Sequence, residues 1–261
     1  RQYYPGTDVQ VIVVDNASGD GSIDMIQTEF SKVVLIENQE NRGFAAANNQ
    51  GLQIAGGRYV LLLNPDTLLL DGAIQKTMVF AESHPDVAVV GCQVWENEQA
   101  IQRTCFPFPT VWGMVRQKAG LRRVFPKGRL FGWIDYGGWE RPTGRDVDVV
   151  SGVYMFFRQE DIPKVGVMDD AYFVFAEETD WCYQFRKAGW RCVFYPSAQI
   201  VHRDGGNKST DQVSVKMFVQ LQKSLLIFYK KNRGYVSWMA AKAIYIISML
   251  ISLLVYSTVS I

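Results

Sequence analysis

Cysteine and histidine are scarce in this chain of 261 residues, which contains four cysteines and two histidines. The cysteines, Cys92, Cys105, Cys182 and Cys192, are far apart and include no C-x-x-C pair. This spacing argues against a structural zinc site and against a dense disulfide framework. We therefore expect reduced, mostly buried thiols, as in a cytosolic enzyme.

The net charge is also small: the 27 Lys and Arg residues nearly balance the 26 Asp and Glu residues, so the formal charge is +1. Nucleic-acid-binding proteins usually show a strongly basic face, so no nucleic-acid partner is expected. Hydrophobic residues make up 48% of the sequence, which is ample for the core of one large α/β domain or two small ones. Arg1–Pro5 lacks the pattern of a signal peptide and is interpreted as a connecting segment.

Charge is missing altogether from the C-terminal segment, Ala243–Ile261, which is close to the length needed to cross a bilayer. Such an apolar stretch is costly to leave in water, so we expect membrane contact through a C-terminal hydrophobic helix over residues 231–261. A buried terminal helix and a helix paired with another subunit are the alternatives. Positive residues precede the segment, which favours the cytoplasmic face of the inner or plasma membrane: Lys223, Lys230, Lys231, Arg233 and Lys242.

Short β-branched runs alternate with helical segments in the first half of the chain. The expected strands are Val9–Asn16, Val33–Asn38, Tyr59–Asn64 and Val87–Val94. Helices ending near Phe30 and covering Ala45–Ala55 and Asp71–Ser83 are expected between them. This alternation predicts an α/β fold with a parallel sheet, in which ligands bind at the carboxyl ends of the strands.

The alternation breaks between Cys105 and Asp146. The segment Phe125–Arg145 is rich in Phe, Trp, Gly and Arg, so we expect a functional loop or a packed surface excursion. Strand character returns over Asp148–Phe157, and a helix begins near Glu178. A short strand is expected around Arg191–Tyr195.

Acidic residues follow two of the predicted strands. Asp15 ends VIVVDN, and Asp66 follows YVLLLN in Asn64-Pro65-Asp66. A carboxylate at the tip of a parallel strand can accept hydrogen bonds from a ribose or bind a cation, and Pro65 stiffens its turn. Each acid taken alone is better explained as a helix cap or a turn residue, and only the presence of two acids on neighbouring strands gives the functional interpretation equal weight.

A third acidic cluster lies in EETDWCYQFRKAGW, Glu177–Trp190. If a helix begins here, Glu178 shares a face with Trp181, Cys182 and Phe185, because their spacings are three, four and seven residues. A glutamate on this inward face can act as a general base. The alternative is a capping cluster, which explains Glu177 and Asp180 better than Glu178.

His202 ends the strand-like segment YPSAQIVH, and the glycine-rich segment Arg203–Ser209 follows it. A histidine at such a position can ligate a metal or contact phosphate. Mobile glycines and basic residues suit a flap that closes on a diphosphate.

Together, these segments resemble the family-2 glycosyltransferases of the GT-A fold, and in particular their rhamnosyltransferase-like branch. The resemblance covers residues 9–230 and implies a Rossmann-like, mostly parallel central sheet flanked by helices in a domain of residues 1–230. The motifs that carry it are VIVVDNASGDGS, NRGFAAANNQG, YVLLLNPD, VVSGVYMFFR and FAEETDWCYQFRKAGW, followed by His202.

The resemblance implies a donor site for a nucleotide-diphosphate sugar and a divalent cation, Mg²⁺ or Mn²⁺. Asn64-Pro65-Asp66 matches the metal-binding D-x-D motif, with Asp66 as the ligand, and His202 completes the metal or diphosphate site. The nucleotide-sugar-binding positions that it implies are Asp15, Asn16, Asn41, Arg42, Asn49, Asn64 and Asp66.

The resemblance also implies the catalytic groups. Glu178 matches the catalytic base, and Glu177 is the alternative because glutamate is longer than the aspartate of many members. Gly152 and Asp180 are assigned to the acceptor side. The implied reaction is a single displacement that inverts the anomeric configuration. Rhamnose is the first candidate sugar, and a saccharide or polyprenyl-linked glycan in cell-surface polysaccharide synthesis is the acceptor.

The sequence departs from this family at its start, where members normally carry an additional strand and helix. We therefore expect a fragment or trimmed boundaries, with the neighbours of that strand left unpaired. Three other functions remain open. A sugar nucleotidyltransferase would release pyrophosphate, and a non-catalytic sugar-nucleotide-binding protein would bind the donor without turnover. A nicotinamide dehydrogenase is disfavoured because no G-x-G-x-x-G motif is present.

Overall fold

A computed structural model describes residues 8–96, 100–118, 136, 139, 143–203 and 214–259, with side chains as far as residue 254. The expected loop Phe125–Arg145 therefore falls largely outside the described residues, and so does most of the Arg203–Ser209 segment. The four cysteines are buried and free, as the sequence indicated.

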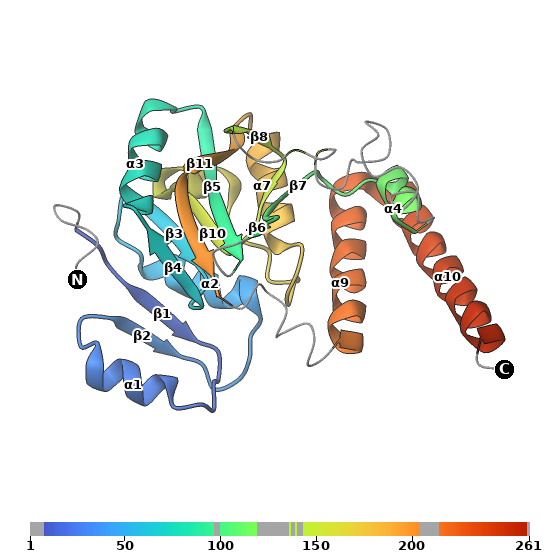
Figure 1. The fold of residues 1–261 in the computed structure, drawn as a ribbon, viewed down its shortest axis with the longest axis horizontal. Helices are drawn as coiled ribbons and strands as arrows, with labels where there is room; N and C mark the ends of the chain where they lie inside the picture. The colour runs from blue at the N-terminus through green and yellow to red at the C-terminus, as the bar shows by residue number, and fades with distance from the viewer. Residues whose placement is uncertain are drawn as a thin grey trace.

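The N-terminal part forms a small parallel sheet of its own. Strands β1 (Ile12–Asp15) and β2 (Val34–Glu37) pair in register from Ile12 with Val34 to Asp15 with Glu37, and α1 (Ser22–Glu29) connects them. Helix α2 (Phe44–Ile54) packs against β1 and leads to the main sheet (Figure 1).

The main sheet has seven strands. Its continuous order is β3-β10-β5-β11-β4, with β6 paired to β5 and β8 paired to β11. The strands on this path are β3 (Tyr59–Leu63), β4 (Thr67–Leu70), β5 (Val87–Glu96), β10 (Tyr154–Arg158) and β11 (Arg191–His202).

The expectation of a mostly parallel central sheet is wrong, because the main sheet is mixed. Strands β5 and β11 are parallel, but β10 runs antiparallel between β3 and β5, and β4 runs antiparallel to β11. The α/β alternation could not reveal this arrangement, since β4 and β10 follow turns rather than crossover helices. Among the described residues, β1 pairs only with β2 and β3 pairs only with β10.

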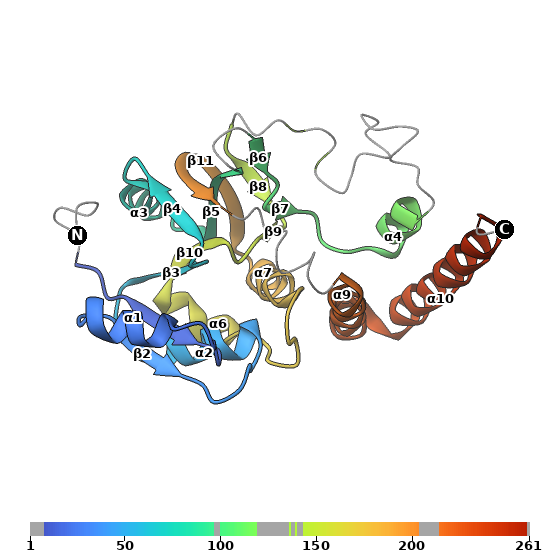
Figure 2. The same ribbon diagram turned by 60° about the horizontal axis from the view of Figure 1, so that its bottom comes forward.

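Two cores cover the two faces of this sheet. Along β10, Met155 and Phe157 face a core shared with α2 and α7 (Glu177–Lys187), whereas Tyr154 and Phe156 face a core shared with α3 (Ala73–Ser83). This alternation follows from the two-residue period of a strand. Figure 2 shows α3 on one side of the sheet and α2 and α7 on the other.

Short elements complete the domain. The predicted strand Asp148–Phe157 is interrupted by a turn at residues 151–153, which separates β9 from β10. The predicted short strand at Arg191–Tyr195 continues to His202 as β11. The remaining elements are β6 (Ala100–Gln102), β7 (Cys105–Phe106), α4 (Val111–Lys118), β8 (Arg145–Val147), β9 (Val149–Val150), η2 (Gln159–Asp161) and α6 (Ile162–Val165).

The C-terminal part is helical, as expected. Helix α9 (Ser214–Phe228) continues through the π-helical turn η3 (Tyr229–Arg233) into α10 (Gly234–Val259). Met114 of α4 packs with Tyr229, Ala241 and Tyr245 in a separate small core. The segment Val215–Leu254 is long and apolar enough to cross a membrane, because an 18-residue window within it has a mean hydropathy of 1.7, and 11% of that window is buried.

Candidate active site

Asp66 and His202 meet at the edge where β4 begins and β11 ends. Antiparallel pairing places His202 opposite Thr67, and the amide of Arg203 donates to the carbonyl oxygen of Asp66 at 3.0 Å. The hydroxyl of Thr67 donates to the carbonyl of Asn64 at 2.7 Å and closes the Asn64–Thr67 turn. As a result, His202 Nε2 lies 3.0 Å from Asp66 Oδ1.

The surroundings of His202 determine what this pair can bind. The imidazole is buried, and its Nδ1 lies 2.9 Å from Gln102 Oε1, which accepts a hydrogen bond in the tautomer that carries its proton on Nδ1. In the neutral ring, Nε2 then presents a lone pair toward the carboxylate of Asp66. Two electron-rich atoms at this distance need a proton or a cation between them. A histidine that donates its other N–H to a fixed acceptor is the usual arrangement of a metal ligand.

The described residues contain no group of three or more His, Cys, Asp or Glu side chains that could hold a metal alone. Among the described residues, Asp66 and His202 therefore supply two side-chain ligands, and water and substrate oxygens are candidates for the other positions of a bound cation. Mg²⁺ commonly binds in this way, through one or two carboxylates together with substrate phosphates.

A second polar network surrounds the end of β1. Asp15 is buried, and its Oδ2 accepts the amide of Ser18 at 3.0 Å, so part of its role is that of a turn acid. Asn16 donates to Asn41 Oδ1 at 3.0 Å and accepts the amide of Arg42 at 3.0 Å. The structure thus brings Asn16, Asn41 and Arg42 together at the loop before α2.

Asn49 lies on α2 and faces a different partner. Its amide group donates to the carbonyl of Met168 at 2.7 Å and accepts the Met168 amide at 3.1 Å. Both polar atoms of Asn49 are therefore engaged with the segment that leads to α7. In this structure the residue fixes that segment.

Glu177 and Glu178 begin α7 after an unusual turn. Phe175 and Ala176 have φ values of 69° and 66°, a left-handed conformation that is unfavourable for side chains other than glycine. Two consecutive residues of this kind mark stored backbone strain, which is common at functional sites. This turn could not be predicted from the sequence, because neither residue is glycine or asparagine.

The two glutamates are poorly solvated. Glu177 is buried, while Glu178 keeps part of its surface exposed, and Oε2 of each has no hydrogen-bond partner. Burial raises the pKa of Glu177 to about 9, and the charge of Glu178 adds to the effect. Burial also raises the pKa of Glu178. A carboxylate of raised pKa is a stronger base, so Glu178 fits the role of a proton acceptor.

The remaining two predicted positions are occupied by structural contacts. A Cβ atom on Gly152 would lie 2.7 Å from the ring of Phe44, so Gly152 allows a close approach of α2. Asp180 is buried, and its oxygens accept hydrogen bonds from Lys231 and Asn232 of η3.

Short contacts connect the turns that carry these residues. The amide of Asn64 donates to the carbonyl of Val153, beside Gly152, and Gly152 touches Phe44. The amide of Phe44 donates to the carbonyl of Phe173, and Asn16 donates to the carbonyl of Gly43. The strand-end turns, the loop before α2 and the segment before α7 therefore form one contiguous region.

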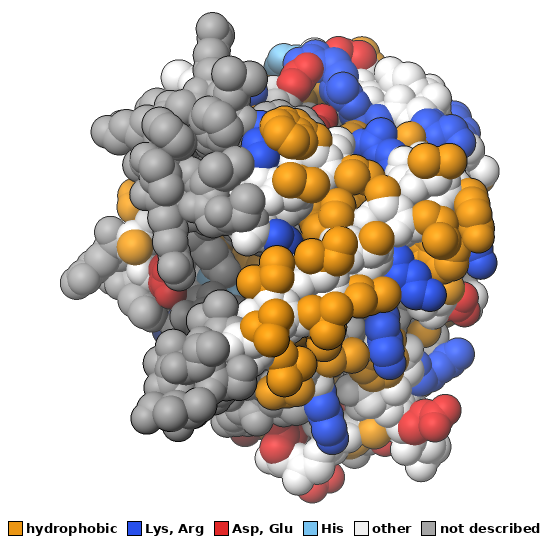
Figure 3. All heavy atoms as spheres, turned by 90° about the vertical axis from the view of Figure 1, so that its right-hand side faces the viewer, with side chains coloured by type: hydrophobic (Ala, Val, Ile, Leu, Met, Phe, Trp, Pro, Cys, Tyr) orange, Lys and Arg blue, Asp and Glu red, His pale blue; other side chains and the backbone are white. Residues whose placement is uncertain are grey.

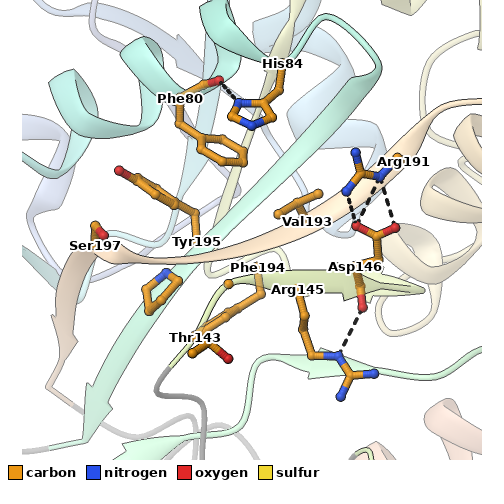
Figure 4. A pocket seen from close by; sticks show the side chains of 12 residues that line it. Phe80, His84, Thr143, Arg145, Asp146, Arg191, Val193, Phe194, Tyr195 and Ser197 are labelled. Atoms are coloured by element: carbon orange, nitrogen blue, oxygen red, sulfur yellow. Dashed lines mark hydrogen bonds and ion pairs between the residues drawn. The ribbon is translucent and has the colours of Figure 1, made fainter.

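A cavity of about 450 Å³ lies elsewhere on the domain. Figure 4 shows its lining, in which Tyr195 and His84 flank the ring of Phe80 and Arg191 pairs with Asp146. The cavity adjoins the first half of β11, whereas His202 is the last residue of that strand. It is therefore separate from the Asp66–His202 pair.

Comparison with known proteins identifies a family model and several similar proteins. A family model described as "Glycosyl transferase family 2" matches residues 1–128. A relative from Mycobacterium tuberculosis, named N-acetylglucosaminyl-diphospho-decaprenol L-rhamnosyltransferase, is 26% identical over 221 residues, which cover 79% of this chain and 70% of the relative.

Two solved structures have a similar fold. The mannosyltransferase PcManGT from Pyrobaculum calidifontis, in complex with GDP-Man and Mn²⁺, aligns with 96% of this chain and 70% of its own, with a TM-score of 0.55 and 17% identity. GalNAc-T7 with UDP, GalNAc and Mn²⁺ has a TM-score of 0.53 and 12% identity, covering 74% of this chain but only 37% of its own. The expected GT-A architecture is confirmed, with a mixed central sheet.

Proposed function

We propose that this chain, a family-2 glycosyltransferase similar to rhamnosyltransferases, transfers a sugar from a nucleotide-diphosphate donor to a hydroxyl of a saccharide or polyprenyl-linked glycan. The reaction is a single displacement that inverts the anomeric configuration and depends on a divalent cation. Rhamnose is the first candidate sugar, and synthesis of a cell-surface polysaccharide is the setting. The relative from Mycobacterium tuberculosis, which is named for a diphospho-decaprenol acceptor, supports this choice.

One observation carries the proposal. Asp66 and His202 come from distant parts of the chain and face each other at 3.0 Å, with Nδ1 of His202 held by Gln102. This pair fits a cation, because it presents a carboxylate oxygen and an imidazole nitrogen to the same point. A cation there, Mg²⁺ or Mn²⁺, would neutralise charge that develops on a departing diphosphate.

The donor occupies the region between this pair and the loop before α2. Asp15, Asn16, Asn41 and Arg42 offer carboxylate, amide and guanidinium groups for a nucleoside and a diphosphate. Hydrogen bonds to Asn41 Oδ1 and from the main-chain amide of Arg42 hold the side chain of Asn16 in place before a substrate arrives. Such preorganisation lowers the cost of binding.

Glu178 removes the proton from the acceptor hydroxyl. Its raised pKa makes it a better proton acceptor than a solvated glutamate. Glu177 is buried, and a pKa of about 9 keeps it protonated at neutral pH. Glu178 lies next to it in the sequence, and burial raises the pKa of both carboxyl groups.

The C-terminal helices bring the enzyme to its acceptor at the cytoplasmic face of a membrane. Helices α4, α9 and α10 and the turn η3 contain no acidic residue and eight basic ones: Arg116, Lys118, Lys216, Lys223, Lys230, Lys231, Arg233 and Lys242. Figure 3 shows hydrophobic side chains interspersed with Lys and Arg on this side of the molecule. Apolar exposure combined with positive charge suits an anionic lipid surface.

The direct test is a donor screen that follows nucleoside-diphosphate release with candidate lipid-linked acceptors and with Mg²⁺ or Mn²⁺. Release that requires acceptor and cation supports the proposal. Pyrophosphate as the product would indicate a nucleotidyltransferase. Donor binding without turnover under all conditions would indicate a non-catalytic binding protein.

A further inference from the structure

The π-helical turn η3 connects the two long C-terminal helices and also contacts the helix that begins at Glu177. Lys231 of η3 donates to Asp169 Oδ2 at 2.6 Å and to Asp180 Oδ2 at 2.8 Å. Asp180 is almost fully buried, with 3% of its side chain exposed, and Lys231 is the cation that pairs with it. Asn232 donates to the other oxygen of Asp180.

These contacts enclose the strained turn before α7. Asp169 precedes Phe175 and Ala176, and Asp180 follows them on α7. Between these two acids, the carbonyl of Val174 accepts the hydroxyl of Ser224, a buried residue of α9, at 2.8 Å. The C-terminal helices therefore hold the segment 169–180 at three points, and Glu177 and Glu178 lie within it.

The same segment also contacts α2, which borders the region proposed to bind the donor. Asn49 of α2 holds Met168 through two hydrogen bonds, and the amide of Phe44 donates to the carbonyl of Phe173. The segment is thus fixed between α2 and the C-terminal helices. A shift of either support changes the position of a turn whose backbone is already strained.

We propose that Lys231 is a positioning residue that couples contact between an anionic lipid surface and the α9–α10 helices to the geometry of Glu177 and Glu178. The proposal rests on the membrane contact proposed above. Two features favour Lys231 as the connecting residue. It belongs to the turn that joins both long helices, and its ammonium group bridges the two acids on either side of the strained turn. π-Helical turns are frequent at functional sites.

Hydrogen exchange tests the coupling without requiring turnover. The full chain is measured with vesicles of phosphatidylcholine and phosphatidylglycerol, and with vesicles of phosphatidylcholine alone. We expect the anionic vesicles to slow exchange of the amides between residues 166 and 180. Lys231→Met should abolish this response while the variant still binds the vesicles, and Lys231→Arg should restore it.

Lys223→Met is the matched control, because Lys223 is exposed on α9 and the substitution removes the same charge. It should keep the exchange response. An unchanged response in Lys231→Met would overturn the proposal. Equal loss in Lys223→Met would also overturn it, because total charge would then explain the effect.

Steady-state kinetics provide the second measurement. Anionic vesicles should raise kcat of the native chain roughly tenfold, and Lys231→Met should lose this increase with little change in KM for the donor. A loss of donor binding in Lys231→Met would indicate a general structural role and contradict the proposal. If the native chain shows no transfer but its exchange response is present and depends on Lys231, the proposed reaction fails and the coupling stands.

Discussion

His202 Nε2 lies 3.0 Å from Asp66 Oδ1, although 136 residues separate them in the sequence. The contact depends on the pairing of β4 with β11, and it leaves a carboxylate and an imidazole nitrogen facing each other. Because these atoms need a positive group between them, the pair is the natural place to test for a cation.

Asp66→Asn should lower transfer by about two orders of magnitude or more, because the amide cannot supply the charge that holds a divalent ion. The measurement is nucleoside-diphosphate release as a function of Mn²⁺ and Mg²⁺ concentration. Asp71→Asn is the control, since Asp71 is exposed and asparagine tolerates its φ of 41°. A native cation response in Asp66→Asn would move the metal site elsewhere.

Glu178→Gln should reduce turnover at least about a hundredfold while donor affinity stays similar, because only the proton acceptor is lost. Single-turnover kinetics and donor titration separate the two effects. Glu177→Gln is the informative partner variant, since this residue is buried next to Glu178. Near-normal turnover in Glu178→Gln, together with an inactive Glu177→Gln, would assign the base to Glu177.

Stability should fall as pH rises from about 4.5 to about 9, because burial raises the pKa of Glu177 from 4.5 to about 9. Over this range the unfolded chain has released a proton that the folded chain retains, so raising the pH favours unfolding. Glu177→Gln should remove much of this slope and raise the free energy of unfolding at pH 8 by at least about 1 kcal/mol.

Urea denaturation at several pH values measures the effect. Glu29→Gln is the control, because Glu29 is exposed on α1. An identical pH slope in the native chain and in Glu177→Gln would show that Glu177 is not the group responsible.

Gly43→Ala should disturb the segment before α7, because a Cβ atom there would lie 2.2 Å from the carbonyl oxygen of Phe173. Gly166→Ala is a close control, since both glycines have a φ of 83° but a Cβ on Gly166 would meet nothing within 4 Å. The backbone penalty, about 1–3 kcal/mol, is common to both, because ψ is 171° at Gly43 and 174° at Gly166. We expect Gly43→Ala to cost about 2 kcal/mol more and to lower kcat. Equal losses of stability in the two variants would show that the contact with Phe173 is unimportant.

Leu253→Asp with Leu254→Asp should weaken binding to anionic vesicles at least about tenfold. Both leucines are about two-thirds exposed on α10, and inserting each into lipid contributes roughly 1.5 kcal/mol or more. Val79→Asp is the control, because Val79 is a similarly exposed hydrophobic residue on α3. Unchanged vesicle binding combined with an altered oligomeric state would mean that α10 packs on another protein subunit.

The resemblance of the motifs to family-2 glycosyltransferases predicted that Asp66 and His202 contribute to one site, and the structure places them 3.0 Å apart. Residues bound by long-range contacts could not be predicted. Gln102 is recognisable as the partner of His202 only once β6 is placed beside β5. The left-handed Phe175 and Ala176 have no local sequence signal, since tertiary contacts impose their conformation.

The fold was likewise predicted where local patterns determine it and missed where long-range pairing does. Periodicity located β3, β5 and α2 within a few residues, because each buries an apolar pattern. The antiparallel insertion of β10 between β3 and β5 is a matter of pairing, which hydrophobic patterning does not encode. The contacts of η3 with Asp169 and Asp180 likewise join segments more than 50 residues apart.

Phe44 and Gly152 restrict how this region can diversify. The aromatic ring fills the space into which a side chain at position 152 would project, with 2.7 Å between the ring and such an atom. A larger residue at position 152 therefore requires a smaller one at position 44. The shapes of the two positions are complementary. The packing between α2 and the turn before β10 can therefore change only through paired substitutions at positions 44 and 152.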